Sequence, residues 1–288
     1  MNKNIKAIIL DVDGVIVGEK IGFNSPWPNP KVISLLKKIR SSGIYICLCT
    51  AKPHFSIGKI IKDAGLDNPH IADGGGVIIN PLADKIIKKY LIDKQSAAEV
   101  INLLIKNQVY TEFYTSDNYF IQQSQKSEIT SKHKHILQKK PQITEFLEKE
   151  AHTQEITKIM PVAKDENDKQ QTADLLKPFE NRIKISWGVH PVALPLQFGI
   201  ITAKGISKKQ GAIEVAKSLN VSFDNILAVG DSTSDWQFIQ LCKYGAAMGN
   251  ASDELKKLVL SKGKKSSLIG KSVDKNGIID MLKYFLKI

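Results

Sequence analysis

Three runs of consecutive apolar residues predict the strands around which this chain is organised. The runs are Ala7–Leu10, Ile44–Cys49 and Ile226–Val229. Because successive side chains of a strand point to opposite faces, an uninterrupted apolar run suits a strand that is covered on both faces. Such strands are typical of a parallel sheet with helices on either side. We therefore expect an α/β fold with a Rossmann-like core and a central parallel sheet.

Helices are predicted where apolar residues recur every three or four positions. In the first of them, Leu36 and Ile39 would face the sheet. The predicted helices are Lys31–Ser41, His54–Ala64, the segment that begins at Lys208, Asp253–Leu260 and Gly277–Leu286. A short core strand, Phe198–Ile201, would lead to Lys208, and Gly245–Asn250 would form a loop.

A second α/β unit is predicted between residues 82 and 190. Its expected strands are Lys85–Ile92, Val109–Tyr114, Tyr119–Gln123, Glu155–Val162 and Arg182–Trp187, and its expected helices are Ser96–Lys106, a lysine-rich stretch and Lys169–Leu176. The chain would then consist of a core, residues 1–81 and 191–288, and an inserted domain, residues 82–190. We expect His133, His135 and His152 on the surface of the insert.

Polar residues follow each predicted core strand. They are Asp11 and Asp13 after the first strand, Thr50 after the second, and Asp231 and Asp235 after the third, with Lys208 at the start of a helix. Two acids one residue apart repel each other unless they share a cation or a proton. The first pair alone fits an ordinary acidic turn equally well. Because parallel strands place their carboxyl ends at one edge of the sheet, however, all six side chains should converge there.

Length and composition indicate an ordinary globular protein. With 288 residues, 42% of them hydrophobic and 24% charged, the chain can form one large or two modest domains. No apolar run is long enough to span a membrane, and the N-terminus lacks the layout of a signal peptide. Cys47, Cys49 and Cys242 form no paired framework, so we expect reduced core cysteines and a cytoplasmic location.

The net charge of +12 is spread along the chain. Lysine doublets such as Lys37-Lys38 and Lys264-Lys265 are far apart, and no basic stretch alternates with aromatic residues as a platform for single-stranded nucleic acid would. We therefore expect no nucleic-acid partner. A lysine-rich surface would favour an anionic substrate.

Four motifs give the chain its resemblance to a known family. In chain order they are Asp11-Val12-Asp13-Gly14-Val15, Thr50-Ala51-Lys52-Pro53, Lys208, and Gly230-Asp231-Ser232-Thr233-Ser234-Asp235. With these motifs the chain resembles the haloacid dehalogenase-like hydrolase superfamily, in particular its Cof-like branch of phosphatases with a large α/β cap. The resemblance covers roughly residues 5–80 and 195–280, and the middle of the chain stands where that cap is inserted.

The resemblance implies a Mg²⁺-dependent phosphatase. Asp11 would be the nucleophile, Asp13 the acid and base, and Thr50 and Lys208 would stabilise the phosphoryl charge. Mg²⁺ would be held by Asp11, Asp231 and the backbone carbonyl of Asp13, with Asp235 acting through water. Further phosphate contacts would come from Gly14, Ala51, Lys52 and Asn250. Lys209 is the alternative to Lys208, Lys52 stands where the family often has arginine, and Asp73 departs from its usual asparagine.

The expected substrate is a small phosphorylated metabolite, a sugar phosphate in the first place. Two alternatives stay open: a phosphosugar mutase of the phosphomannomutase type, and a non-catalytic protein that binds a phosphorylated ligand. The sequence names neither the substrate nor the oligomeric state.

Overall fold

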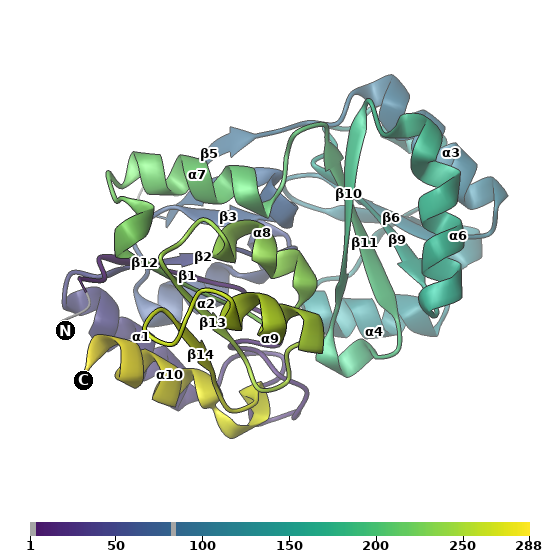
Figure 1. Cartoon of the computed structure of the whole chain (residues 1–288). Helices are drawn as coiled ribbons and strands as arrows, with labels where there is room; N and C mark the ends of the chain where they lie inside the picture. Colours follow the sequence, from purple (N-terminus) through teal and green to yellow (C-terminus); the bar gives the residue numbers. More distant parts are fainter. Residues whose placement is uncertain (1–3, 82–84) are drawn as a thin grey trace.

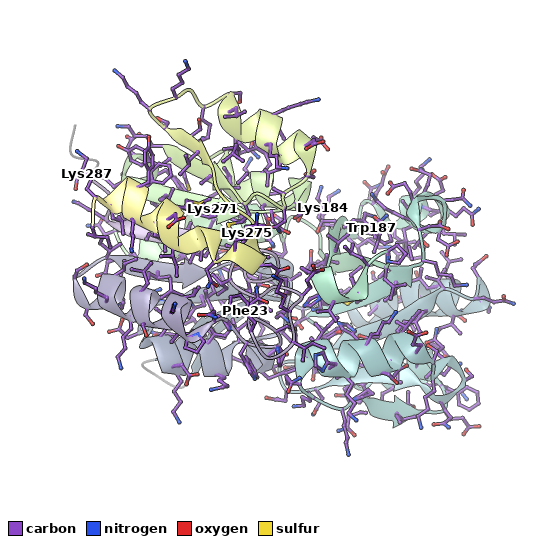
Figure 2. All side chains as sticks on the ribbon, turned by 90° about the horizontal axis from the view of Figure 1, so that it is seen from below. Phe23, Lys184, Trp187, Lys271, Lys275 and Lys287 are labelled. Atoms are coloured by element: carbon purple, nitrogen blue, oxygen red, sulfur yellow. The ribbon has the colours of Figure 1, made fainter. Side chains whose placement is uncertain are left out.

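The computed structural model describes residues 4–81 and 85–288, which form two α/β units that lie side by side (Figure 1; seen from below in Figure 2). One unit is built on a five-stranded sheet and the other on a six-stranded sheet. We call them the five-stranded unit and the six-stranded unit. Among the described helices, none has the length and apolar character needed to cross a lipid bilayer.

The five-stranded sheet is entirely parallel, as the uninterrupted apolar runs predict. Its strands, in spatial order, are β14 (Ser267–Ile269), β13 (Tyr244–Ala247), β12 (Ile226–Gly230), β1 (Ala7–Leu10) and β2 (Tyr45–Leu48). Strand β1 lies between β12 and β2, so Ala7 pairs with both Ile226 and Tyr45. The expected α/β class with a central parallel sheet is therefore confirmed.

Helices cover both faces of this sheet, and the side-chain alternation of β1 decides which core each residue joins. Ile8 and Leu10 pack against the helices on one face of the sheet, and Ala7 and Ile9 pack against the helices on the other face. The first face carries α1 (Pro30–Ser41), α2 (Gly58–Ala64) and α10 (Gly277–Leu286), and the second carries α7 (Lys208–Ser218), α8 (Trp236–Ile239) and α9 (Asp253–Leu260). Figure 1 shows α7, α8 and α9 on the side of the sheet opposite α1 and α10.

A small antiparallel sheet lies between the two units along the chain. It contains β3 (His70–Ala72), β4 (Val77–Asn80) and β5 (Lys85–Lys89). Cys49, just beyond β2, bridges to Ile71 of β3, so this sheet is attached to the five-stranded unit. The predicted strand Lys85–Ile92 therefore pairs on this side, before the six-stranded unit begins.

The six-stranded sheet is antiparallel apart from one parallel pair, β7 with β8. Its spatial order is β10 (Ile183–Val189), β11 (Gln197–Ala203), β9 (Lys158–Ala163), β6 (Tyr110–Tyr114), β7 (Tyr119–Gln122) and β8 (Gln142–Thr144). One face packs against α3 (Lys94–Lys106), α5 (Leu147–Ala151) and α6 (Glu166–Leu176). The other face packs against α4 (Glu128–Leu137) and reaches Ala51 and Phe55 of the five-stranded unit.

Three of the local predictions are wrong. The loop expected at Gly245–Asn250 is wrong in its first half, because Tyr244–Ala247 form strand β13. The strand expected in the core at Phe198–Ile201 belongs to β11 and pairs with β9 and β10 in the six-stranded sheet. His133, expected on the surface, is only 3% exposed, and its Nδ1 lies 2.7 Å from Oε2 of Glu112.

Candidate active site

The carboxyl ends of the central strands bring the predicted acids together, as expected for a parallel sheet. Asp11 directly follows β1, and its backbone N–H donates to the Val229 carbonyl of β12 at 3.0 Å. The turn after it needs a glycine, because Gly14 has a φ of +76° and an added Cβ would lie 1.9 Å from Oδ2 of Asp231. Gly14 therefore lets the first and fourth motifs approach each other.

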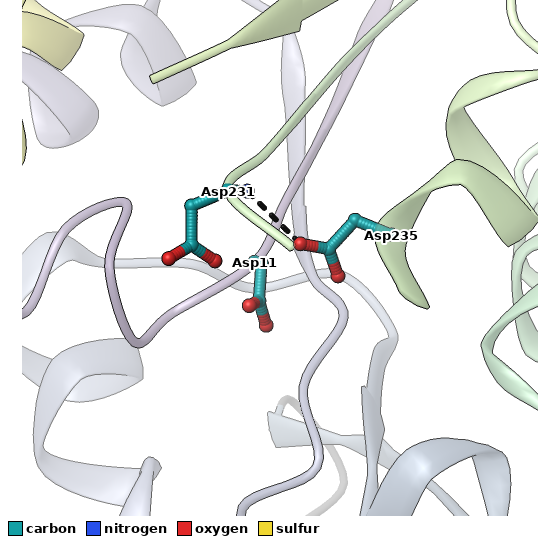
Figure 3. A group of neighbouring side chains, drawn as sticks. All are labelled: Asp11, Asp231 and Asp235. Atoms are coloured by element: carbon teal, nitrogen blue, oxygen red, sulfur yellow. Dashed lines mark hydrogen bonds between the residues drawn. The ribbon is translucent and has the colours of Figure 1, made fainter. Parts of the chain in front are cut away.

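Asp11, Asp231 and Asp235 form a carboxylate cluster (Figure 3). One oxygen from each lies within 4.8 Å of the others. Burial, the Asp235 charge and the Asp13 charge raise the pKa of Asp11 to about 7, although Lys208 opposes them. Burial and the charges of Asp235 and Asp11 also raise the pKa of Asp231. Such mutual repulsion is what a bound cation would relieve.

Lys208 supplies a cation to two of the three carboxylates. It begins α7, is 7% exposed, and places its Nζ 3.1 Å from Oδ1 of Asp11 and 2.7 Å from Oδ1 of Asp235. The alternative lysine, Lys209, points to solvent. Across residues 4–81 and 85–288, no lysine, arginine or histidine nitrogen lies within 4.0 Å of an Asp231 oxygen. The cluster therefore retains an uncompensated carboxylate, which suits a divalent cation with oxygen ligands.

The carboxylate of Asp235 is already occupied by groups of the chain. Its Oδ2 accepts the backbone N–H groups of Asp231 and Ser232, both at 3.0 Å, while its Oδ1 faces Lys208. These contacts hold the loop after β12 and orient the lysine. Asp235 is thus placed to position Lys208 and to hold the loop that carries Asp231.

A small cavity opens beside the cluster, and we call it the first cavity. Its walls include Asp11, Asp13, Thr50, Ala51, Lys208 and Asp231 from the five-stranded unit, and Ser186, Gly188, Val189 and Ile200 from the six-stranded unit. Thr50 is 1% exposed, and its carbonyl accepts the backbone N–H of Gly74 at 3.0 Å. The six-stranded unit therefore covers the cavity that lies at the carboxyl ends of the central strands.

One oxygen of the Asp13 carboxylate faces two nitrogens. Its Oδ1 lies 3.1 Å from Nζ of Lys52 and 3.1 Å from Nε2 of His190, without the alignment of regular hydrogen bonds. Burial would raise the pKa of Asp13, but Lys52 and His190 outweigh it and hold this pKa below its usual range. The backbone N–H of Val192 donates to Nδ1 of His190 at 3.2 Å, so in the neutral ring the proton is on Nε2, toward Asp13.

A second cavity adjoins the first under the six-stranded sheet. Asp13, Ala51, Gly188, Val189 and Ile200 border both cavities. Lys52, expected among the phosphate contacts, borders the second cavity, and its Nζ also donates to the Ile136 carbonyl of α4 at 3.1 Å. Asp13 therefore stands between a space beside the acid cluster and a space under the inserted sheet.

Asn250, another expected phosphate contact, holds loops together. Its Nδ2 donates to the Gly14 carbonyl at 2.9 Å and lies 3.4 Å from Oδ2 of Asp231, and its Oδ1 accepts the N–H of Val273 at 2.8 Å. Its three partners come from three separate segments of the five-stranded unit. Asn250 is thus placed to fix the relative position of the first and fourth motifs.

A buried ion pair joins the two units beside the second cavity. Nζ of Lys158, on β9, lies 3.1 Å from Oδ1 of Asp73, and both side chains are 0% exposed. The same Nζ donates to the Ala51 carbonyl at 2.7 Å, and Oγ1 of Thr157 donates to Oδ2 of Asp73 at 3.2 Å. Asp73, noted as a departure at the sequence level, therefore binds a lysine of the inserted unit.

Sequence reasoning missed the residues that the six-stranded unit brings to the site. His190, Lys158 and Ser186 lie on or beside strands of that unit and belong to no motif. Their signal is weak: a histidine directly after a strand, and a lysine at the start of an apolar strand. Such a lysine is buried only with a partner, and the sequence does not say which.

The comparisons with known proteins agree with this geometry. The pattern of the haloacid dehalogenase-like hydrolases matches residues 8–282. The chain belongs to the haloacid dehalogenase-like hydrolase family. The family resemblance drawn from the four motifs is thereby confirmed.

Two relatives of this chain carry phosphatase names. The 5-amino-6-(5-phospho-D-ribitylamino)uracil phosphatase YwtE of Bacillus subtilis (strain 168) is 24% identical over 296 residues, covering 95% of this chain and 96% of the relative. Pyridoxal phosphate phosphatase YbhA of Escherichia coli (strain K12) is 22% identical over 256 residues, covering 87% and 90%. These names agree with the expected enzyme class, a phosphoric monoester hydrolase.

Among solved structures, a sugar phosphatase of subclass IIB of this superfamily has the same fold. It superposes with a TM-score of 0.78 at 21% sequence identity, and the match covers 98% of this chain and 100% of the other. This likeness supports the fold of both units.

Proposed function

We propose that this protein is a Mg²⁺-dependent phosphatase that hydrolyses a small phosphate monoester through an aspartyl-phosphate on Asp11. The observation that carries the proposal is the place of Asp13, which borders both cavities. A phosphoryl group beside Asp11 and an alcohol under the six-stranded sheet would meet at the Asp13 carboxylate. That is where the bridging oxygen needs a proton.

The residues fit the metal that the family implies. Asp11 and Asp231 offer oxygens of a crowded cluster, and we propose that they hold Mg²⁺ together with the Asp13 carbonyl. When bound, the cation neutralises negative charge on the phosphoryl group and on the cluster. We assign Asp235 to the orientation of Lys208, because its oxygens already accept bonds from the chain.

Two half-reactions follow from this arrangement. In the first, an oxygen of Asp11 attacks phosphorus, the bond from phosphorus to the alcohol oxygen breaks, and Asp13 gives that oxygen a proton. In the second, Asp13 takes a proton from water as the water attacks the aspartyl-phosphate, which releases phosphate and restores Asp11. Lys208 and Thr50 stabilise the charge on the phosphoryl oxygens.

Asp13 must hold a proton before the first step, although Lys52 and His190 favour its ionised form. A dianionic phosphoryl group in the first cavity supplies negative charge next to Asp13 and would raise its pKa. Binding of the substrate would thus protonate the acid that the reaction needs, and departure of the alcohol would leave a base for the second step.

We also propose that the six-stranded unit is the substrate-selecting cap. The predicted boundaries were 82 and 190, and residues 82–84 lie outside the described residues. Strand pairing favours a cap that spans about residues 91–203. Strand β5 pairs with β4 and so stays outside the cap, whereas β11 pairs with β9 and so belongs to it. The substrate would be a small phosphorylated metabolite, of which the expected sugar phosphate is one. A cytoplasmic location fits the three unpaired, buried cysteines.

The variant Asp11→Asn tests this proposal. It keeps the shape of the side chain but removes the attacking carboxylate, so release of phosphate from p-nitrophenyl phosphate with Mg²⁺ should fall to background. The exposed Asp253→Asn on α9 is the matched control and should keep the activity. Circular dichroism would verify that both variants are folded. Turnover of folded Asp11→Asn near the wild-type rate, or full activity after chelation of divalent ions, would refute the proposal.

A further inference from the structure

The second cavity has properties that restrict the alcohol part of the substrate. It measures about 60 Å³ and lies between Lys52, the end of α4 and the strands β9 and β11. Much of its wall is apolar, with Ile136, Met160, Phe198 and Ile200 all buried. An ester whose phosphoryl group lies beside Asp11 would extend into this space past Asp13.

In the free protein the cavity offers no unbalanced positive charge. Lys52 faces Asp13, and Lys158 faces Asp73. His133, on the same wall, lies 2.7 Å from Oε2 of Glu112. A second phosphate or a carboxylate on the alcohol would therefore be buried without a cation of its own, which is strongly unfavourable. The charge distribution favours an uncharged alcohol.

The lysines of the cavity have little capacity left to bind hydroxyl groups. Nζ of Lys52 already serves Asp13 and the Ile136 carbonyl, and Nζ of Lys158 serves Asp73 and the Ala51 carbonyl. An ammonium has three N–H groups, so each lysine has about one left. A buried hydroxyl without a partner weakens binding by at least about fivefold. Several hydroxyls on one alcohol would multiply that loss.

The size of the cavity favours a compact alcohol. Its volume is about 60 Å³, so a bulky group would fit poorly. The hydroxyls of a hexose would in addition need hydrogen-bond partners in this space.

We propose that the substrate of this site is the phosphate monoester of a compact, uncharged and largely apolar alcohol, rather than a sugar phosphate or a bisphosphate. This inference rests on the proposed phosphatase function and narrows it. It also disfavours the phosphosugar mutase considered from the sequence, because a mutase must hold a substrate with a second phosphate.

Benzyl phosphate and glucose 6-phosphate form a matched pair for the test. Each carries its phosphate on a CH₂–O group attached to a six-membered ring, so both release a primary alcohol. With Mg²⁺ present, kcat/KM for benzyl phosphate should exceed that for glucose 6-phosphate by at least about 100-fold. Equal values, or preference for the sugar, would overturn the inference and leave the phosphatase function intact.

Two variants test whether the second cavity determines the preference for benzyl phosphate over glucose 6-phosphate. Met160→Gln puts an amide of similar length on the cavity wall and should lower kcat/KM for benzyl phosphate about tenfold, with a smaller effect on glucose 6-phosphate. Ile143→Gln, on the same sheet but 45% exposed, is the control and should change neither value. An unchanged ratio of the two substrates in a folded Met160→Gln variant would contradict this placement.

Hydrolysis of p-nitrophenyl phosphate separates the two proposals. If that ester is hydrolysed but benzyl phosphate is not, the inference about the alcohol is wrong and the phosphatase function stands. If Mg²⁺ supports hydrolysis of none of the three esters, the phosphatase function fails and the inference fails with it.

Discussion

Removal of the Asp73 carboxylate should destabilise the protein strongly, because it leaves Lys158 buried without its counter-charge. Both side chains are fully buried, with 3.1 Å between Nζ and Oδ1. Asp73→Asn is the suitable change, because Asp73 has a φ of +51°, which asparagine also tolerates. Breaking a buried pair by removing one partner costs about 3–5 kcal/mol in the free energy of unfolding. This corresponds to a fall in Tm of roughly 10 °C.

A second variant distinguishes the charge from the packing. In Asp73→Asn/Lys158→Met the unpaired ammonium is gone and its volume is partly retained, so most of the lost free energy should return. The matched control is Glu155→Gln. It breaks the ion pair of Glu155 with Lys89 at 2.9 Å, in which the side chains are 59% and 33% exposed. Such an exposed pair contributes at most about 1 kcal/mol.

Urea unfolding followed by circular dichroism measures these differences. The comparison requires that the free energy of unfolding depends on urea concentration with the same slope in all variants. A change in the urea midpoint then reports a change in stability. If Asp73→Asn lost no more free energy than Glu155→Gln, the pair would not hold the units together. A double variant less stable than Asp73→Asn would show that the lysine is stabilised by its other contacts.

Two further predictions concern the site. Asp13→Asn should slow turnover of an alkyl phosphate by about 10²–10⁴-fold at saturating Mg²⁺. With p-nitrophenyl phosphate, whose leaving group needs no proton, a burst of nitrophenolate should precede slow turnover. Full rescue of the activity by more Mg²⁺ would refute the assignment of Asp13 as acid and base. Gly14→Ala places a Cβ 1.9 Å from Oδ2 of Asp231 and should reduce kcat by about 10²-fold through displacement of the loop. Gly43→Ala is the control, because Gly43 has a φ of +93° but open space around it. This variant introduces backbone strain without a steric clash and should keep kcat. Equal losses of kcat in both glycine variants would attribute the effect to backbone strain.

The strand ends explain why much of the site could be predicted. Asp11, Thr50 and Asp231 each directly follow an apolar strand, or lie within two residues of its end, and parallel pairing leaves little freedom in where they meet. Lys208 could be placed because Ser207 caps the helix that it begins. In each case a local pattern fixes the position of the side chain.

Contacts between the two units could not be predicted in this way. The approach of His190 to Asp13 and of Lys158 to Asp73 depends on how the six-stranded unit docks, and no spacing in the chain encodes that. Strand β13 was missed for a different reason. Its Gly245, Ala246 and Ala247 have low intrinsic strand preference, and their buried position between β12 and β14 decides their conformation.

The pairing of β1 with β12 also determines the order in which the molecule can be assembled. Ala7 lies beside Ile226, so the whole six-stranded unit is synthesised after Asp11 and before the other two acids of the carboxylate cluster. That unit has its last strand, β11, by Ala203, before β12 has been made. Contacts between residues so distant in sequence form late, because the entropy of closing the intervening chain is lost first. Asp11 therefore leaves the ribosome well before Asp231 and Asp235, the two acids that complete its carboxylate cluster.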